Sequence, residues 1–393
     1  MGFSSGSISF RRFAVVGKAP KSPDQDLLDK LAEHALRPQE FGVPEEIEYG
    51  WSGGRHVFDG QFSLEHNVFA DALHFALRID TNKVPGDVKK AWQIMEEEAV
   101  AQNNPSGFIS KNQKKDVKET VRKKVEEDMR SGKFRRSKLL PILWDLTTQT
   151  LFCSAGGAAF EKLAEIFQRS FGLDLEPISS GSQAVRILAP AARKRDYEDL
   201  KPTRFVQGPE GEGQAPDYPW VAKGGEAKDF LGNEFLLWLW HEADARSGSI
   251  KTEAGEITAF IDRALDLDCA YGQTGKDTLR GDGPSRMPEA RDALRSGKLP
   301  RKAGLLLDAN GQQFALTLAG DSMAVGGAKL PDVEEAESPR VLFEERIALL
   351  RDLCQAIDGL YEVFLKSRTT SGWESQTGTI RRWILKPDKA AAA

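Results

Sequence analysis

The sequence predicts an α/β protein of the α+β type, with mixed or antiparallel sheets, hairpin-plus-helix units and one projecting helical arm. The first observation is a repeated layout, since residues 139–171 and 303–366 each read as a hairpin followed by an amphipathic helix. The second is a strongly basic stretch with a thin apolar edge at residues 111–138, which suits a helix with little buried surface. The third is composition, because 40% hydrophobic and 29% charged residues over 393 positions fit two or three globular domains.

The chain is expected to open on a sheet-and-helix domain formed by residues 1–82 and 139–190. ISFRRFAVV (8–16) reads as a strand because β-branched and aromatic residues dominate it. Ser22 and Pro23 are expected to cap and start a helix. A Gly-containing loop and two strands should follow, at 38–56, 56–62 and 68–80.

Residues 83–138 are expected to form a basic helical arm. One helix is predicted from about Pro85 to Ala101 and a second up to about Arg130, with a break at 103–107 between them. The two helices should pack as a helical hairpin that projects from the sheet. In the second helix the apolar edge recurs every four residues, at Val117, Val121, Val125 and Met129.

Charge is the main signal of this arm. Residues 111–138 hold twelve Lys/Arg and five Asp/Glu, an excess of seven positive charges on a chain whose net charge is −5. Charge runs on helices are commonly solvated faces, and pairs such as Lys115 with Glu119 and Arg122 with Glu126 would neutralise part of this one. The continuation KFRRSK contains no acid and interleaves an aromatic with the bases, which suits contact with phosphate. We therefore interpret the segment as a nucleic-acid-facing arm, a local footprint on an acidic protein.

The elements expected after the arm show apolar periodicity or have turn residues at their ends. Up to residue 250 they are a hairpin of strands at 139–145 and 150–154, a helix at 158–171, a strand at 184–188, a loop at 190–225 and a buried helix from Phe230 to about Gly248. Beyond it they are a strand within 250–264, a Gly-rich loop at 272–283, a helix at 287–298, a hairpin around Asn310-Gly311, a strand at 322–329 and a long helix at 338–366. Residues 266–393 are expected to form a C-terminal α/β domain.

Two patterns resemble nucleotide or metal sites, and each has a plainer interpretation. GQTGKDT (272–278) lacks the first glycine of a phosphate loop, because Ala270 stands in its place, and Asp277 follows the lysine where Ser or Thr is needed. His241-Glu242 has no second histidine at the helical spacing that binds metal, so a structural histidine is favoured.

Two further patterns resemble catalytic sites. GWSGG (50–54) offers Ser52 as a nucleophile, but the segment is not set between a buried strand and a helix. Asp262, Asp266 and Asp268 crowd together, yet a nuclease site also needs a Lys or His in a metal-friendly arrangement. We therefore expect a protein that is not an enzyme, with no catalytic residues, no metal ligands and no cofactor.

The three cysteines, Cys153, Cys269 and Cys354, are isolated along the chain. An odd number without framework spacing predicts reduced thiols and a cytoplasmic protein. FLLWLW (235–240) is too short to span a bilayer, and the N-terminus has no apolar stretch of signal-peptide length. No membrane partner is expected.

Several stretches, in this order along the chain, resemble the recombination-associated protein RdgC family. They are ISFRRFAVV, Gly50-Trp51, FALRIDTNKVP, KKDVKETVRKKV, Leu140-Pro141 leading into LWD, FEKLAEIFQRSFGLDLEPIS, RDALRSGKLPRKAGLLLDANGQQFALTL and LPDV. Together they cover roughly 1–185 and 280–335, and their collinear order is the specific part. The resemblance implies a ring-shaped dimer that binds DNA without sequence preference through a basic central hole and restrains the RecA recombinase.

The resemblance also implies roles for particular residues. The candidate DNA-binding residues of the arm are Lys111, Lys114, Lys115, Lys118, Arg122, Lys123, Lys124, Lys133, Arg135, Arg136 and Lys138. Phe134 lies at the family's aromatic–basic dimer contact. The family's second basic patch corresponds to RGDGPSR in this sequence, where Arg280 and Arg286 are the basic residues. Residues 191–265 are atypical of the family, so an added partner site or a changed ring shape is expected there.

The sequence thus predicts a homodimer that encircles duplex DNA without sequence preference. It would be nucleoid-associated in the cytoplasm and would modulate homologous recombination, through a RecA-type recombinase, or replication. Single-stranded DNA stays open as the ligand. The alternative is a protein–protein adaptor in a DNA repair or anti-phage defence complex, whose basic arm docks an acidic partner. A metal-dependent nuclease is the third hypothesis.

Overall fold

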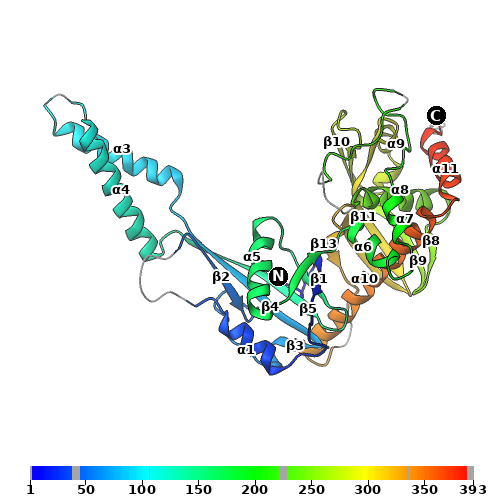
Figure 1. The fold of residues 1–393 in the computed structure, drawn as a ribbon, viewed down its shortest axis with the longest axis horizontal. Helices are drawn as coiled ribbons and strands as arrows, with labels where there is room; N and C mark the ends of the chain where they lie inside the picture. Colours follow the sequence, from blue (N-terminus) through cyan, green and yellow to red (C-terminus); the bar gives the residue numbers. More distant parts are fainter. Residues whose placement is uncertain are drawn as a thin grey trace. The chain divides into compact units, whose positions relative to one another are not determined.

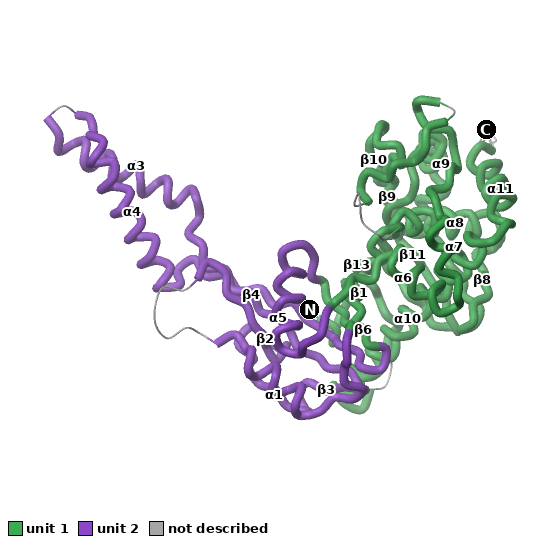
Figure 2. The backbone as a smooth tube through the Cα atoms, viewed as in Figure 1, with its two compact units in different colours: residues 1–16, 149–154, 175–393 green, residues 17–148, 155–174 purple. Residues whose placement is uncertain are grey.

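The computed structural model describes residues 2–37, 45–105, 107–211, 213–221, 228–333 and 336–386. Its strands pair antiparallel and helices pack beside them, which confirms the α+β class (Figure 1). The chain forms two compact units (Figure 2). Unit 1 comprises residues 1–16, 149–154 and 175–393, and unit 2 comprises residues 17–148 and 155–174.

Unit 1 is built on strands in the order β10-β9-β11-β12-β13-β1-β6, with β7 on β1 and β8 on β9. Their bounds are β1 (Ile8–Val16), β6 (Thr150–Cys153), β7 (Asp174–Pro177), β8 (Ser249–Thr252), β9 (Gly255–Cys269), β10 (Lys276–Gly281), β11 (Lys298–Ala309), β12 (Gln312–Ala319) and β13 (Ala324–Lys329). Asn310 and Gly311 join β11 to β12 with φ of 54° and 79°, which confirms the predicted type I′ turn. Strand β9 runs through residue 265, where the sequence suggested a domain boundary.

The helices of unit 1 include one that is buried along most of its length, α8. The helix bounds are α6 (Ser180–Leu188), α7 (Lys194–Asp199), α8 (Phe230–Ala245), η1 (Pro284–Arg286), α9 (Pro288–Arg295), α10 (Pro339–Arg368) and α11 (Trp373–Leu385). The rings of Phe235 and Trp238 pack 5.6 and 5.8 Å from that of Phe364 on α10. A Cβ at Gly232 would lie 1.8 Å from the carbonyl oxygen of Gly320, so α8 meets the end of β12 backbone to backbone. The predicted buried helix is confirmed.

A buried ion pair links α8 to α10. The Arg368 Nε donates to the Glu234 carboxylate at 2.7 Å, and both side chains are less than a tenth exposed. The backbone N–H of Thr203 donates to the other carboxylate oxygen at 2.6 Å. Burial raises the pKa of Glu234, although Arg368 and Thr203 oppose that shift.

Unit 2 combines the strand order β5-β4-β2, with β3 on β4, and helices that cover it. The strands are β2 (Ile47–Ser52), β3 (Val68–Phe69), β4 (Ala72–Asn82) and β5 (Arg135–Asp145), and the helices are α1 (Gln25–Glu33), α2 (Leu64–Asn67), α3 (Gly86–Gln102), α4 (Lys111–Ser131) and α5 (Ala158–Phe171). The apolar face of α5 packs on the sheet, with the Phe167 ring 5.1 Å from that of Trp144. The Trp51 indole N–H donates to the Ser170 hydroxyl at 2.9 Å.

Three expectations near the N-terminus are wrong. The cap of the first helix is Asp24, because its carboxylate accepts the Leu27 N–H at 3.0 Å, and the helix starts after it. Residues 56–62 form a turn and not a strand, since the Asp59 carboxylate accepts backbone N–H groups from Arg55 and Gln61. Strand β2 lies instead within the expected loop, of which residues 38–44 fall outside the described parts of the chain.

Three differences concern the rest of the chain. The segment expected as a strand at 184–188 belongs to helix α6, which starts at a capping box formed by Ser179 and Ser182. Strand β10 lies within the expected Gly-rich loop, and its mostly exposed side chains explain why no apolar alternation marks it. Helices α2, α7 and α11 and strand β7 were not expected.

The remaining predicted elements are found close to their expected bounds. All three cysteines are free and buried, which agrees with isolated thiols. In the part of the chain that the structure describes, no helix has the length and apolar character needed to cross a membrane.

Candidate nucleic-acid interface

The arm consists of α3 and α4, which lie side by side and connect β4 to β5 (Figure 1). Ser110 and Gln113 form a capping box at the start of α4. The Gln113 and Asn104 amides also exchange two hydrogen bonds, of 2.9 and 3.0 Å, so the start of α4 is tied to the end of α3. Gly132 ends α4 with a φ of 70°. The predicted helical hairpin is confirmed.

The side of α4 that meets α3 is the predicted apolar edge. Val117 is buried there, and the Lys124 ammonium lies 2.5 Å from the Glu96 carboxylate on α3. A helix turns about 100° per residue. The basic residues that recur at three- and four-residue spacing, Lys111, Lys115, Lys118 and Arg122, therefore share one face, which borders the apolar edge.

Four of the twelve basic residues in 111–138 form ion pairs. They are Arg122 with Glu119 and Glu126 at 2.6 and 3.3 Å, Lys124 with Glu96, Lys133 with Asp128 at 3.2 Å, and Arg135 with Asp80 and Glu48 at 2.7 and 3.1 Å. The expected Arg122–Glu126 pair is confirmed. The expected Lys115–Glu119 pair is wrong, because Arg122 takes both oxygens of Glu119.

The other eight basic residues are exposed, and no carboxylate of the described chain lies within ion-pair distance of them. They are Lys111, Lys114, Lys115, Lys118, Lys123, Arg130, Arg136 and Lys138. Sequence reasoning did not single out Arg130, although its seven-residue spacing from Lys123 places the two on one helix face. Of the five acids in this segment, only Asp116 and Glu127 form no ion pair in the described chain. The arm therefore presents a net positive surface to solvent.

Arg135 differs from its neighbour Arg136. Its guanidinium is about a quarter exposed and reaches Asp80 and Glu48, which are 1% and 9% exposed. Burial alone would raise the pKa of Asp80, but hydrogen bonds from Arg78, Ser137 and Arg135 hold it below its ordinary value. Arg135 thus neutralises a buried carboxylate, whereas Arg136 is solvated. DNA binding by Arg135 stays a prediction, although the carboxylates of Asp80 and Glu48 already hold its guanidinium.

The two arginines should therefore respond differently to removal. Arg135→Ala is expected to lower the free energy of unfolding of unit 2 by about 1–3 kcal/mol, because a charge-assisted hydrogen bond to a buried acceptor is lost. Arg136→Ala should change it by less than about 0.5 kcal/mol, as is usual for a surface substitution. Urea unfolding of the two variants checks this. Equal stability of both would contradict the structural role of Arg135.

Apolar side chains are also exposed on the arm. Phe108, Met95 and Ile94 are 81%, 63% and 46% exposed. Phe134 is partly buried, with the Lys133 ammonium 5.5 Å from its ring. Its role as a dimer contact stays a prediction.

The second candidate patch belongs to unit 1. Arg280 on β10 pairs with Asp266 on β9 at 2.9 Å, so its charge is partly compensated. Arg286 is exposed at the end of η1, and no carboxylate of the described residues pairs with it. Arg286 is therefore available to bind an anion, whereas the charge of Arg280 is partly neutralised by Asp266.

The three aspartates considered for a nuclease site are each paired with basic residues and do not form one site. Asp262 pairs with Arg263 at 3.4 Å, Asp266 with Arg280, and Asp268 with Lys276 and Arg301 at 3.3 Å each. In the described parts of the chain no group of three His, Cys, Asp or Glu side chains is placed to hold a metal ion.

The other two motif residues are held by the fold. The Ser52 hydroxyl is buried and donates to the carbonyl oxygen of Asp59 at 2.9 Å. His241 is buried, and its ring lies edge-on to that of Trp383 at 5.5 Å. Comparison of the chain with models of known protein families and with curated protein sequences found no match.

Proposed function

We propose that this protein binds DNA without sequence preference through the exposed cations of its arm. The observation that supports this most is the set of eight exposed Lys and Arg residues in 111–138 that form no ion pair with the described residues. The face from Lys111 to Arg122 extends along about 17 Å of helix. A duplex carries about ten phosphate charges over that length. Charge neutralisation would supply the affinity, and no groove-reading motif is present in the sequence to supply specificity.

In this proposal a homodimer encircles duplex DNA and modulates homologous recombination by restraining a RecA-type recombinase. Support for it is the sequence resemblance described above, together with the exposed basic residues of α4, the segment to which that resemblance assigns DNA contact. Enclosure would slow the escape of DNA held by individually weak contacts. Retention on circular DNA but not on linear DNA after a high-salt wash would distinguish a closed ring from simple surface binding.

Salt titration tests the electrostatic part. The affinity for a fluorescently labelled duplex is expected to fall between about 50 and 200 mM salt by a factor on the order of 10³, if about six phosphates are contacted. Two duplexes of unrelated sequence should give the same curve, measured by fluorescence anisotropy. A complex that is insensitive to salt would rule out this mechanism.

The second candidate function is an adaptor that docks an acidic protein. The exposed Phe108 and Met95 favour it, because exposed apolar side chains beside charge suit a protein partner. Tight binding to an acidic protein with no retention of DNA would favour the adaptor over the DNA-binding protein.

A further inference from the structure

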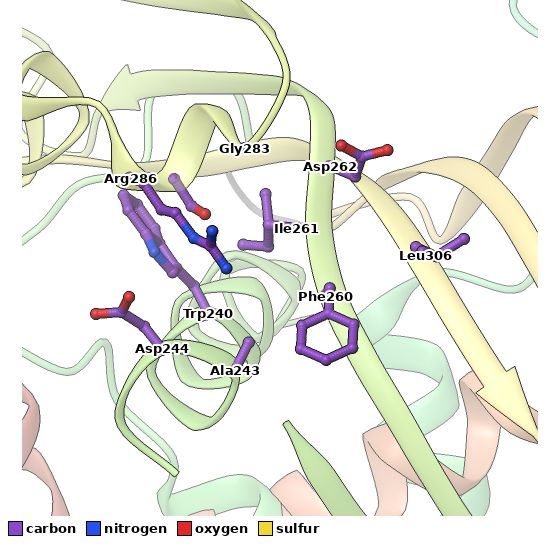
Figure 3. Close-up of a pocket in the computed structure, with 10 residues that line it drawn as sticks. Trp240, Ala243, Asp244, Phe260, Ile261, Asp262, Gly283, Arg286 and Leu306 are labelled. Carbon is purple, nitrogen blue, oxygen red and sulfur yellow. The ribbon is translucent and has the colours of Figure 1, made fainter. Parts of the chain in front are cut away.

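Unit 1 contains a pocket of about 290 Å³ bounded by α8, β9, β11 and the segment that includes η1 (Figure 3). This volume is enough to hold several water molecules. It belongs to unit 1, whereas the arm belongs to unit 2. Two of its lining residues, Arg286 and Asp262, were singled out in the sequence, but for other roles.

An irregularity in β9 shapes one wall of this pocket. The pairing register between β9 and β11 shifts around Gly304, and Arg263 has a φ of 62°. A Cβ at Gly304 would lie 2.0 Å from the carbonyl oxygen of Asp262, so only glycine fits opposite the bulge. Bulges of this kind re-aim side chains and are common next to binding sites.

One positive charge in the pocket, that of Arg286, is not neutralised by a carboxylate of the described residues. Asp244 accepts from the Arg291 guanidinium and from the Trp383 indole N–H, both at 2.6 Å. Asp262 pairs with Arg263. Arg286 forms no ion pair with the described residues, and Figure 3 shows its guanidinium reaching into the hollow between Trp240 and Ile261. An uncompensated cation in a pocket favours an anionic occupant.

The pocket also has apolar walls. Phe260 is 41% exposed, and Ile261 and Leu306 add aliphatic surface.

We propose that this pocket binds a small organic carboxylate that bears a flat apolar group. The fork of a guanidinium matches the two oxygens of a carboxylate, so Arg286 would hold the anionic end. Phe260, Ile261 and Leu306 would cover the flat apolar part. A phosphate dianion fits less well, because Asp244 and Asp262 line the same small space.

Isothermal titration with benzoate tests the proposal. Benzamide has the same shape without the charge, and its affinity is expected to be weaker by about tenfold or more. Arg286→Gln should weaken benzoate binding by a similar factor, and Phe260→Ala should weaken it several-fold. Both residues are exposed enough for these variants to fold. Arg195→Gln, which removes an exposed arginine on α7 that has no described carboxylate partner, is the matched control and should bind benzoate normally.

Several outcomes would overturn the proposal. They are no benzoate binding at millimolar concentration, equal binding of benzoate and benzamide, tighter binding of inorganic phosphate, or unchanged benzoate affinity in Arg286→Gln. Measuring the affinity of Arg286→Gln for duplex DNA distinguishes a role in this pocket from a role in DNA binding. Loss of DNA affinity with benzoate affinity kept would assign Arg286 to DNA. Failure of the arm to bind DNA would leave the carboxylate site unaffected.

Discussion

The salt dependence of DNA binding is expected to flatten when four lysines of α4 are replaced together by Gln: Lys111, Lys114, Lys115 and Lys118. Each phosphate contact contributes about 0.9 to the slope of log affinity against log salt. Losing four of about six contacts should therefore reduce the fall between about 50 and 200 mM salt from on the order of 10³ to about tenfold. Fluorescence anisotropy with one labelled duplex measures both slopes. The fold should be preserved, because these side chains are exposed and form no ion pair with the described residues.

The control changes net charge by the same amount away from the arm. It replaces four exposed lysines by Gln: Lys18, Lys21, Lys201 and Lys251. This variant should keep the wild-type salt slope, because a local footprint and not total charge supplies the affinity. An equal reduction of the salt slope in both variants would show that DNA affinity depends on overall charge and would contradict binding through the arm.

The largest expected effect on stability comes from Arg368→Met. This change leaves the Glu234 carboxylate, which is 0% exposed, without its cation. Breaking a buried ion pair by removing one partner costs about 3–5 kcal/mol. Urea unfolding at pH 7, followed by tryptophan fluorescence, should show the loss in the transition of unit 1.

Protonation gives this prediction a second test. Burial raises the pKa of Glu234, so the folded state binds a proton more readily than the unfolded state. Stability linked to this group therefore increases as pH falls, and the deficit of Arg368→Met should be smaller at pH 5 than at pH 8. The double variant Glu234→Gln, Arg368→Met removes both charges and should recover much of the loss. A deficit that neither low pH nor the second substitution reduces would mean that packing on Trp373, and not charge, is responsible.

The arm was predictable because its signals are local. Val117, Val121, Val125 and Met129 mark a helix by spacing alone, and the break near Asn104 separates it from α3. Exposure of the lysines followed from the narrowness of that apolar edge. Pairing of Arg135 was not predictable, because Asp80 and Glu48 are 55 and 87 residues away and meet it only through the register of β2, β4 and β5.

Elsewhere, prediction failed for elements that are defined by tertiary contacts and not by a local sequence pattern. Strand β2 contains Gly50 and is followed by Gly53 and Gly54, so the sequence indicates a loop there. The packing of Trp51 on α5, which buries the end of the strand, cannot be read from the local sequence. Strand β10 is an edge strand with mostly exposed side chains, so it has no alternation to detect. The pocket at Arg286 is lined by residues from four separate elements, and one of its walls depends on the bulge opposite Gly304. Neither feature can be read from a local sequence pattern.

Helix α3 has no fully buried side chain, in contrast to α8. Its stability depends on α4, and a segment with so few buried contacts opens at a lower free-energy cost than the core of the domain. The part of the molecule with the most concentrated positive charge is thus also among those least secured by burial. A bound polyanion would relieve repulsion among its lysines, so occupancy and local order in the arm should rise together.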